Sequence, residues 1–379
     1  MRLRKVILIV RHGTRTPCFA GDTLDGRVFP TELTDLPESS VSTKRTGLGG
    51  IEPPFSTRDE SYKNMKTLIG GECGFGQLTR KGATDQYNLG LKLRGNYGKG
   101  DSALVKPEYD PSDIIVRSTN IKRTVDSAKY ILAGLYEGQK RNPTIPIYVT
   151  EDIEKNEGDI IETKIDFIIE RTEHLIKDSK HLPGQNELVG PARELTRLLK
   201  SKETNMYVMV DNLLTLDHLG IPLSIPDETW KRVKDWSFKI SSLCTLGRKE
   251  ERLELLPLLC GTLIDDFLHK LELPMDETPN MYLYSGHDAT LMRILTALRI
   301  EIHSVPSPSS VVAIEIYQDD TNMQTYAKVL YNWMEQLIRG GKVSLITFKH
   351  FKDVLSPYRM SLKRFKSICD SKSLLEISL

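Results

Sequence analysis

The segment RHGTRTP at residues 11–17 contains the residue types that hold a phosphate group against a nucleophile. Arginine offers charge-assisted, fork-shaped donors that match phosphate oxygens, and histidine is one of the side chains that can form a covalent intermediate. Gly13 lets the backbone come close to a bound group. The apolar run at residues 6–10 predicts a buried strand that ends at this segment. We therefore expect His12 to lie at a strand end, between two arginines.

Two later segments bring side chains of the same kind to strand ends. Residues 113–116 predict a strand that ends in Arg117, and residues 281–284 predict a strand that leads into His287 and Asp288. Ligands of α/β sheets bind at the carboxyl ends of parallel strands. The three strand ends therefore predict a single site at one edge of a sheet.

The order of these segments resembles that of the histidine phosphatases, in the branch that contains the acid phosphatases and phytases. The resemblance covers most of the chain and is weakest in residues 150–275. Several further segments are similar to the lysophosphatidic acid phosphatase type of this family: GQLT at 76–79, LG at 89–90, LR at 93–94, RSTNI at 117–121, LAGL at 132–135 and LY at 283–284.

This resemblance implies a role for each residue of the site. His12 aligns with the nucleophile that becomes a phosphohistidine, and Asp288 aligns with the proton donor to the leaving group. The implied activity is that of a phosphoric monoester hydrolase, a histidine acid phosphatase. The phosphate-binding positions of the family align with Arg11, Arg15, Arg117 and His287.

Elementary electrostatics supports these roles. Oriented cations around a transferring phosphoryl group stabilise its transition state, and they offset the repulsion between an anionic ester and its nucleophile. Nearby positive charge disfavours imidazolium, so we expect a depressed pKa for His12 and a neutral ring in mildly acidic solution. We expect no metal ion and no other cofactor, since the sequence shows no His-x-x-x-His or clustered carboxylate ligand set.

These residues indicate the reaction more clearly than they indicate the substrate. Lysophosphatidic acid is the leading substrate by resemblance, and a broad-specificity acid phosphatase or an inositol-phosphate phosphatase is the alternative. A phytase-like site predicts a strongly basic lining, whereas a lipid site predicts an apolar channel. A mutase is disfavoured because Arg15 stands where that class has a small residue. A catalytically silent ligand-binding protein is disfavoured because all six expected site residues are present.

The elements that position these residues predict an α/β fold with a mixed, mainly parallel central sheet, flanked by helices and carrying an inserted α-helical cap. Residues 1–149 and 276–379 are expected to form a discontinuous α/β catalytic core. Residues 150–275 are highly charged and helix-periodic, and are expected to form the cap. The irregular stretch 18–76 follows the motif directly, so we expect it at the rim of the site.

Strand and helix signals alternate in the expected core, and the expected cap shows helix signals almost alone. Pro146 would confine its strand to a sheet edge. Strands are expected at 3–10, 113–116, 145–149, 281–284, 311–317, 326–333 and near 342–347. Helices are expected at 79–95, 121–137, 162–178, 190–201, 204–219, 227–246 and 250–272, after residue 288, and in two stretches near the C-terminus.

Charge and hydropathy exclude several partners for this chain of 379 residues. Lys and Arg total 52 against 51 Asp and Glu, a formal net charge of +1. Nucleic-acid binding normally shows as a basic surplus, so the expected partner is a small phosphomonoester, with a lysophospholipid as the leading candidate. No apolar run approaches the ~18 residues of a membrane-spanning helix, so no transmembrane segment is expected.

Cysteine usage and the N-terminus predict a cytoplasmic protein. The basic start, MRLRK, is followed by only five apolar residues, so we expect it to belong to the first strand; an organellar or secreted form would require that a targeting segment has been removed. An odd number of widely spaced cysteines matches neither a disulfide framework nor a metal site, so reduced thiols are expected. The five are Cys18, Cys73, Cys244, Cys260 and Cys369.

The remaining histidines and the tryptophans are expected to have structural roles, at the surface or in packing. Ser285 is expected in a turn, because no serine-hydrolase elbow surrounds it. These residues are His174, His181, His218, His269, His303 and His350, with Trp230, Trp236 and Trp333.

Overall fold

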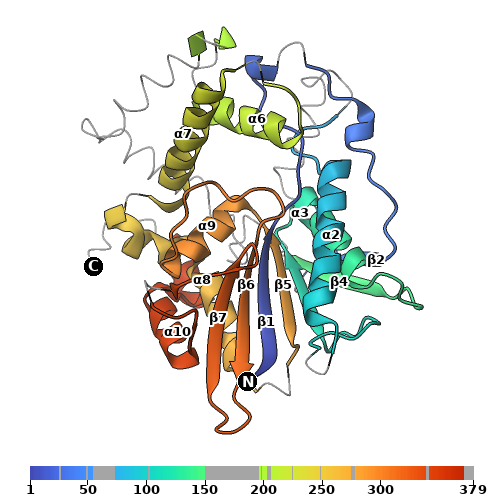
Figure 1. Ribbon diagram of the computed structural model, residues 1–379, viewed down its shortest axis with the longest axis vertical. Coiled ribbons are helices and arrows are strands. Elements are labelled where there is room, and N and C mark those ends of the chain that lie inside the picture. Colours follow the sequence, from blue (N-terminus) through green and yellow to red (C-terminus); the bar gives the residue numbers. More distant parts are fainter. Residues whose placement is uncertain are drawn as a thin grey trace.

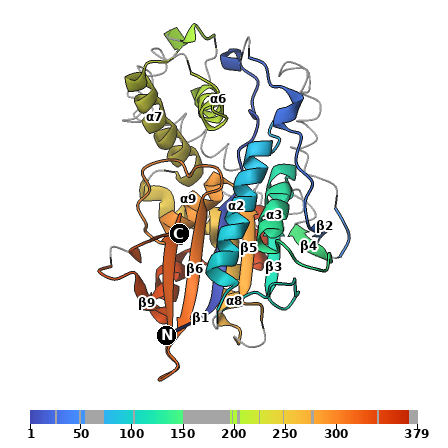
Figure 2. The same ribbon diagram turned by 45° about the vertical axis from the view of Figure 1, so that its right-hand side comes forward.

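A computed structural model gives the arrangement of the elements around the expected site (Figure 1). A twisted sheet occupies one half of the molecule, with helices against both of its faces, and helices α6 and α7 lie beyond the end of the sheet where strand β1 finishes (Figure 2). The structure describes residues 1–24, 27–47, 50–53, 73–100, 103–149, 196–197, 199–202, 206–223, 225–247, 249–274, 278–338 and 341–370.

The sheet is mixed, as expected, with its parallel part around the site. Strands β2, β4, β3, β5 and β1 are parallel neighbours in that order, and β6, β7 and β8 continue the sheet antiparallel, with β9 also paired to β7. The strands of this nine-stranded sheet are β1 (Arg2–Arg11), β2 (Ser42–Gly47), β3 (Ile114–Ser118), β4 (Thr144–Val149), β5 (Met281–Gly286), β6 (Val311–Gln318), β7 (Thr325–Tyr331), β8 (Met334–Glu335) and β9 (Leu345–Thr347).

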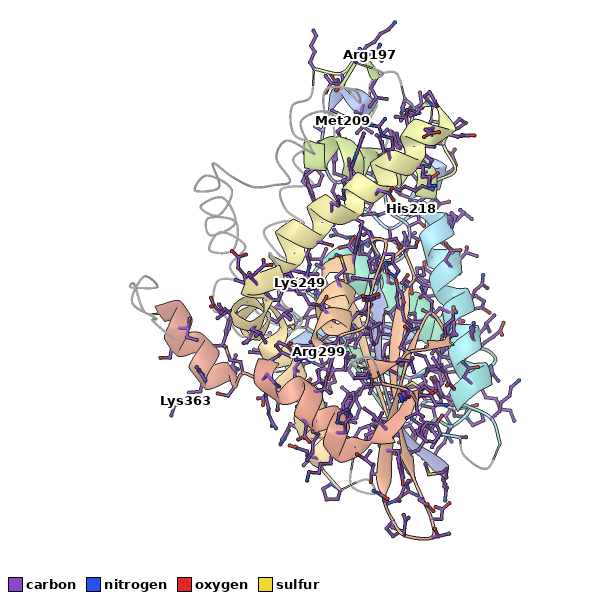
Figure 3. All side chains as sticks on the ribbon, turned by 60° about the vertical axis from the view of Figure 1, so that its left-hand side comes forward. Arg197, Met209, His218, Lys249, Arg299 and Lys363 are labelled. Atoms are coloured by element: carbon purple, nitrogen blue, oxygen red, sulfur yellow. The ribbon has the colours of Figure 1, made fainter. Side chains whose placement is uncertain are left out.

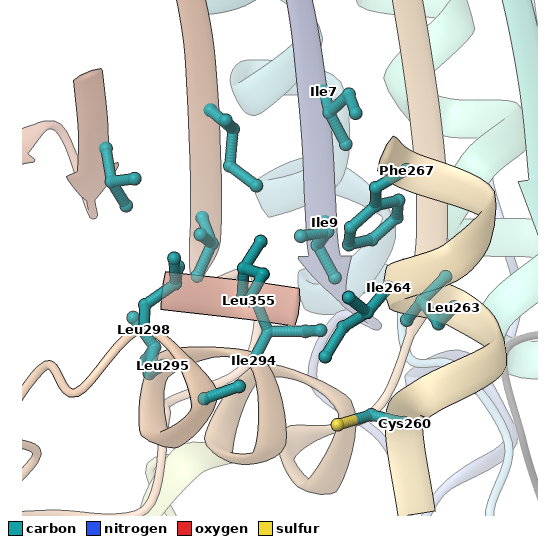
Figure 4. Close-up of a cluster of buried hydrophobic side chains, with 14 of the residues drawn as sticks. Ile7, Ile9, Cys260, Leu263, Ile264, Phe267, Ile294, Leu295, Leu298 and Leu355 are labelled. Carbon is teal, nitrogen blue, oxygen red and sulfur yellow. The ribbon is translucent and has the colours of Figure 1, made fainter. Parts of the chain in front are cut away.

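Helices cover both faces of the sheet, which explains why β1 reads as a continuous apolar run. Ile7 and Ile9 face one cluster with α8, α9 and α10 (Figure 4), while Val6 and Leu8 face the opposite cluster with α2 and α3. The helices are α2 (Arg80–Tyr97), α3 (Lys122–Leu135), α6 (Met206–His218), α7 (Asp227–Leu246), α8 (Arg252–Glu272), α9 (Asp288–Ala297), α10 (Phe348–Leu355) and α11 (Leu362–Asp370).

Three details of the sheet differ from the sequence-based expectation. Ser285, expected in a turn, lies inside β5, where its hydroxyl donates to the Thr124 carbonyl at 2.7 Å. Strand β2 lies within the stretch 18–76, which was expected to be irregular. As a result Pro146 is not at an edge, since β4 pairs with β2 on one side and with β3 on the other. The pairing with β3 is confined to Arg117 and Tyr148, so it does not need the N–H that proline lacks.

In the segment expected to form the cap, the structure describes three of the expected helices. Helices α6 and α7 agree with the expectations at 204–219 and 227–246. Helix α8 packs its apolar face against the sheet, through Leu263 and Phe267. The helix expected at 162–178 and most of that at 190–201 lie outside the described residues, so the division into core and cap stays a prediction.

Among the residues that the structure describes, no helix is both long and apolar enough to cross a membrane. Within the same described part of the chain, Cys18, Cys73 and Cys260 are buried free thiols.

Helices α2 and α3 cross with their backbones in contact, which brings both helices close to the strand end that carries His12. The contact requires glycine in each helix. A Cβ on Gly90 would lie 2.1 Å from the carbonyl oxygen of Ile131, and a Cβ on Gly134 would lie 2.1 Å from that of Tyr87.

We expect Gly134→Ala to destabilise the protein by about 1–3 kcal/mol, because the added methyl group must push the two helices apart. Gly95→Ala is the matched control, since a Cβ there has no neighbour within 4 Å and alanine favours a helix interior over glycine by about 0.5–1 kcal/mol. Urea unfolding of both variants measures the difference. Equal stability of the two would contradict the close contact.

Candidate active site

The adjacent parallel strands β1 and β5 place two histidines side by side. Arg11 and Gly286 are partners in the register, and the N–H of His12 donates to the Gly286 carbonyl at 2.9 Å. His287 is the next residue along β5. The ring centroids of His12 and His287 are 5.5 Å apart, with the ring planes at 71°. The structure thus brings together the two histidines expected at this site.

The turn after β1 is held against α2 and α3 by contacts that leave no room for a side chain. A Cβ on Gly13 would lie 2.5 Å from the Gly82 carbonyl oxygen. The N–H of Gly13 donates to Ser127 Oγ at 3.1 Å, and the N–H of Thr79 donates to the Thr14 carbonyl at 2.9 Å. These bonds fix the orientation of the turn relative to the sheet.

One hydrogen bond determines the tautomer of the His12 ring. Nδ1 lies 2.8 Å from the carbonyl oxygen of Gly13, and a carbonyl can only accept. Nδ1 therefore carries the proton, and Nε2 of the neutral ring has the free electron pair. This is the state that a nucleophilic histidine requires.

The environment of His12 keeps that ring neutral. Its side chain is buried. Burial, followed by the charges of Arg123 and Arg11 and smaller contributions from His287 and Arg15, holds the pKa of His12 well below its ordinary value. The depressed pKa expected for His12 is thus present, although the largest contributing charge comes from an arginine that the sequence analysis did not single out.

Arg11 and Asp288 form an ion pair at the floor of the site. Nη2 of Arg11 lies 2.7 Å from Oδ2 of Asp288, and Nη1 donates to the Pro306 carbonyl. Burial opposes ionisation of Asp288, but the charges of Arg11 and Arg15 and the N–H of Ala289 outweigh it, so the pKa of Asp288 lies below its ordinary value. This carboxyl group is therefore ionised.

Arg15 is held by α6. Its Nη2 donates to Asp211 Oδ1 at 2.8 Å, and its Nη1 donates to Thr215 Oγ1 at 3.1 Å. Neither partner of Arg15 was predicted from the sequence. Asp211, Thr215 and His218 are spaced i, i+4 and i+7, so they share one face of the helix, and this polar stripe in a largely apolar helix was the signal available.

His287 caps the N-terminus of α9. Its side chain accepts a hydrogen bond from the backbone of Thr290, whose hydroxyl in turn accepts from the His287 N–H at 3.2 Å. Nε2 of the ring lies 3.1 Å from Thr119 Oγ1. This double attachment orients the ring at the positive end of the α9 dipole, where an anion is stabilised.

Arg117 and Arg123 have different surroundings. Side chains alternate along β3, so Arg117 faces α8, where its Nη1 lies 3.0 Å from Oδ2 of Asp266. The same carboxylate oxygen accepts from Lys270 Nζ at 2.7 Å and from Tyr284 OH at 2.5 Å. Arg117, expected in the phosphate clamp, thus belongs to a polar cluster between α8 and the sheet.

Arg123 lies in the first turn of α3 and is only 4% exposed. Within the described residues its Nε and Nη1 atoms have no hydrogen-bond partner. Donors of a buried cation are normally paired, so these atoms are available to an anion at the site. Arg123 is six residues beyond Arg117, and its position at the start of a helix that follows a strand was the signal that sequence analysis overlooked.

A cavity of about 360 Å³ lies above the arginines, between the strand ends and the helices α6 and α7. Arg11, Arg15 and Asp288 line its floor. One correction concerns His218, which was expected to be a surface or packing residue but lines this cavity. The other wall residues are Tyr207, Val210, Asp211, Leu214, Thr215, Asp217, Lys234, Ser237, Ser241, Thr245, Ser304, Val305 and Ser307.

The remaining residues with expected structural roles include His269, His303 and His350, which are exposed, and Trp236, which packs between α6 and α7. His174 and His181 lie outside the described residues. Among the residues that the structure describes, no three His, Cys, Asp or Glu side chains converge in a group that could hold a metal ion.

Comparison with protein families identifies one match. The Histidine phosphatase superfamily (branch 2) matches residues 2–186. Similar curated proteins include the human (Homo sapiens) lysophosphatidic acid phosphatase type 6, which is 26% identical over 393 residues covering 100% of this chain and 88% of that protein. The lysosomal acid phosphatase of Bos taurus is 29% identical over 268 residues, covering 65% of this chain and 61% of that protein.

Solved structures show the same fold. The phytase of Citrobacter braakii aligns with a TM-score of 0.62 at 12% identity, covering 95% of this chain and 98% of that one. The multiple inositol polyphosphate phosphatase of Bifidobacterium longum, in complex with inositol hexasulfate, aligns with a TM-score of 0.61 at 14% identity, covering 94% and 93%. At this identity the likeness concerns the fold alone.

We expect the depressed pKa of His12 to make stability depend on pH. The unfolded chain takes up a proton on this histidine near pH 6.5, whereas the folded protein does not, so stability falls as the pH decreases below 6.5. Between pH 7.5 and 5.0, wild type should lose about 1–2 kcal/mol more than His12→Gln in urea unfolding without phosphate. If the unfolding free energies of wild type and His12→Gln fell equally with decreasing pH, His12 would not be held neutral in the folded protein.

Proposed function

We propose that this chain, a phosphomonoester hydrolase whose residues 2–186 match the histidine phosphatase superfamily (branch 2), hydrolyses lysophosphatidic acid through a phosphohistidine on His12. The observation that carries the mechanism is the bond between His12 Nδ1 and the Gly13 carbonyl, which leaves Nε2 as the nucleophile. The similarity to lysophosphatidic acid phosphatases over the whole chain supports the substrate.

In the proposed reaction, Nε2 of His12 attacks the phosphorus atom and the bond to the ester oxygen breaks. Asp288 donates a proton to the departing alkoxide and then accepts one from the water that hydrolyses the phosphohistidine. Arg11 and Arg15 hold the phosphoryl oxygens, and their fixed charges stabilise the transition state. His287 lies beside this clamp at the N-terminus of α9, whose dipole favours the bound anion.

We propose Arg123, in place of Arg117, as the third arginine of this clamp. Two observations support the assignment: two donor atoms of Arg123 have no partner among the described residues, and its charge is the largest that acts on His12. Arg117 is instead bound to Asp266.

The cavity wall favours a monophosphate over a polyphosphate. Beyond Arg11 and Arg15, the described part of the wall contains a single basic side chain, Lys234, together with the carboxylates of Asp211 and Asp217. An inositol polyphosphate would need added cations around its ring. The wall also contains apolar surface suited to the start of an acyl chain, from Tyr207, Val210, Leu214 and Val305.

An inositol-phosphate phosphatase or a broad-specificity acid phosphatase is the alternative. The fold of the solved phytases fits it, and so does the hydroxyl-rich character of part of the wall. A lysophospholipid would gain apolar contacts for its acyl chain, whereas an inositol phosphate would gain only polar contacts. Comparing turnover of the two substrate classes therefore distinguishes the two assignments.

Arginine variants test the composition of the clamp. We expect Arg123→Ala to lower kcat/KM at least ~10²-fold, as for the loss of one strong electrostatic donor to the transition state. Arg117→Ala, the matched control, should change kcat/KM far less and should lower stability, because it removes one partner of a largely buried ion pair. Steady-state kinetics on an aryl phosphate, with urea unfolding, measure both; the reverse pattern would place Arg117 in the clamp.

A substrate series tests the lipid assignment. Each buried methylene contributes about 0.8 kcal/mol, so kcat/KM should rise several-fold per few carbons from glycerol 3-phosphate to lysophosphatidate, until the chain outgrows the cavity. Inositol phosphates should be poorer substrates. His12→Ala is the control and should release no phosphate from any of them. If kcat/KM did not change with chain length, the lipid assignment would be wrong and a broad-specificity acid phosphatase would be favoured.

A further inference from the structure

The part of the cavity wall that α6 and α7 form contains polar atoms without hydrogen-bond partners among the described residues. Ser237 of α7 lines the cavity and is 2% exposed, and its Oγ has no hydrogen-bond partner within the described residues. On α6, Asp211 also lines the cavity and uses Oδ1 to bind Arg15, while its buried Oδ2 has no partner in the described part of the chain.

Hydroxyl groups in helices can donate to the carbonyl four residues earlier, as Ser127 does to Arg123 and Thr84 does to Arg80. Ser237 makes no such bond within the described residues. A buried polar atom without a partner destabilises the fold and calls for an explanation in each case. A ligand group in the cavity that hydrogen-bonds to Ser237 provides one.

His218 adds a second group to the same wall. It ends α6 and lies between the upper helices and the α/β part of the molecule (Figure 3). Burial and the charges of Arg11 and Arg15 lower the pKa of His218 to about 3, so the ring is neutral in mildly acidic solution. A neutral imidazole has one donor and one acceptor, which suits a hydroxyl group and not a second phosphate.

Helix packing holds these groups in place. A buried cluster that includes Met209 and Leu213 of α6 and Val233 and Trp236 of α7 joins the two helices. Groups on elements packed in this way are positioned more precisely than groups on loops. The cavity volume, about 360 Å³, is at the small end of ligand pockets, which span about 300–1,000 Å³. A substrate whose phosphate sits on the arginines therefore has its adjacent carbons at this wall.

We propose that Ser237 and His218 form a subsite for a hydroxyl group of the leaving alcohol, so that the enzyme selects phosphomonoesters with a hydroxyl on the carbon next to the ester carbon. The inference rests on the proposed function, because it places the phosphate at His12. For lysophosphatidate, the group bound is the free hydroxyl of the glycerol backbone. A site built to bond a hydroxyl rejects the analogue that lacks it more strongly than an apolar pocket rejects a missing methylene.

Two matched substrate pairs measure this selection. The short pair is glycerol 3-phosphate and propane-1,3-diol monophosphate, which lacks the middle hydroxyl. The long pair is lysophosphatidate and its analogue without the same hydroxyl. Wild type should prefer the hydroxyl-bearing member of each pair at least ~10-fold in kcat/KM. Ser237→Ala should bring that ratio close to one while the kcat/KM of the deoxy member is retained.

Ser242→Ala is the matched control. Ser242 is on the same helix and its Oγ is also buried without a partner in the described chain, but it does not line the cavity. This variant should keep the wild-type preference. If Ser237→Ala does not fold, His218→Phe should lose the preference and His218→Gln, which retains a donor and an acceptor, should keep it.

The outcomes separate this inference from the proposed function. No preference in wild type, or equal losses on both members of each pair in Ser237→Ala, overturns the hydroxyl subsite. A preference in the short pair without turnover of the long pair supports the subsite and removes the lipid assignment. Absence of phosphate release from every substrate, including an aryl phosphate, overturns the proposed function and this inference with it.

Discussion

Positive charge concentrated beside one imidazole ring is the constraint on which the rest of the structure depends. Like charges repel strongly in a low-dielectric interior, and three arginines are buried close to His12. Two of them are offset by carboxylates from distant parts of the chain, Asp288 at the start of α9 and Asp211 on α6. The arginines of the first strand end can therefore be buried only when both helices are in place. Helix α6 therefore balances part of the positive charge of the site and also lines the cavity above it.

The sheet and the helices α2 and α3 solve the complementary problem of position. Parallel pairing of β1 with β5 places the two histidine rings side by side. The register of the backbones determines this position, and no particular side-chain contact is needed. The turn at Gly13 then meets Gly82 backbone to backbone, and Ser127 of α3 accepts from its N–H. Glycine at both contact points keeps the helices close enough for Arg123 to contribute its charge at the ring.

Local sequence patterns determine much of this arrangement, and the exceptions have a common cause. The continuous apolar run of β1, the strand before His287 and the bounds of α7 follow from hydrophobic periodicity and strand ends, and all were predicted. β2, the interior position of Pro146 and the partners of Arg117 depend on contacts between segments far apart in the chain, for which periodicity carries no information. His218 was assigned a surface or packing role for the same reason, because a histidine at the end of α6 comes to line the cavity only when that helix packs near the arginines.

The pairing of Arg11 with Asp288 also links substrate binding to proton transfer in the proposed reaction. The arginine charges outweigh the effect of burial and keep Asp288 ionised, and an ionised carboxylate cannot donate the proton that the leaving group needs. In this proposed reaction a bound phosphate would take over the hydrogen bonds of Arg11 and offset its charge, and burial would then raise the pKa of Asp288. Phosphomonoesters have a second pKa of about 6, so in acid the substrate itself brings the proton that Asp288 needs. After the alcohol has left, the same group is again a carboxylate, ready to accept a proton from water. One carboxyl group can therefore serve as acid and then as base because the charge beside it changes with each step.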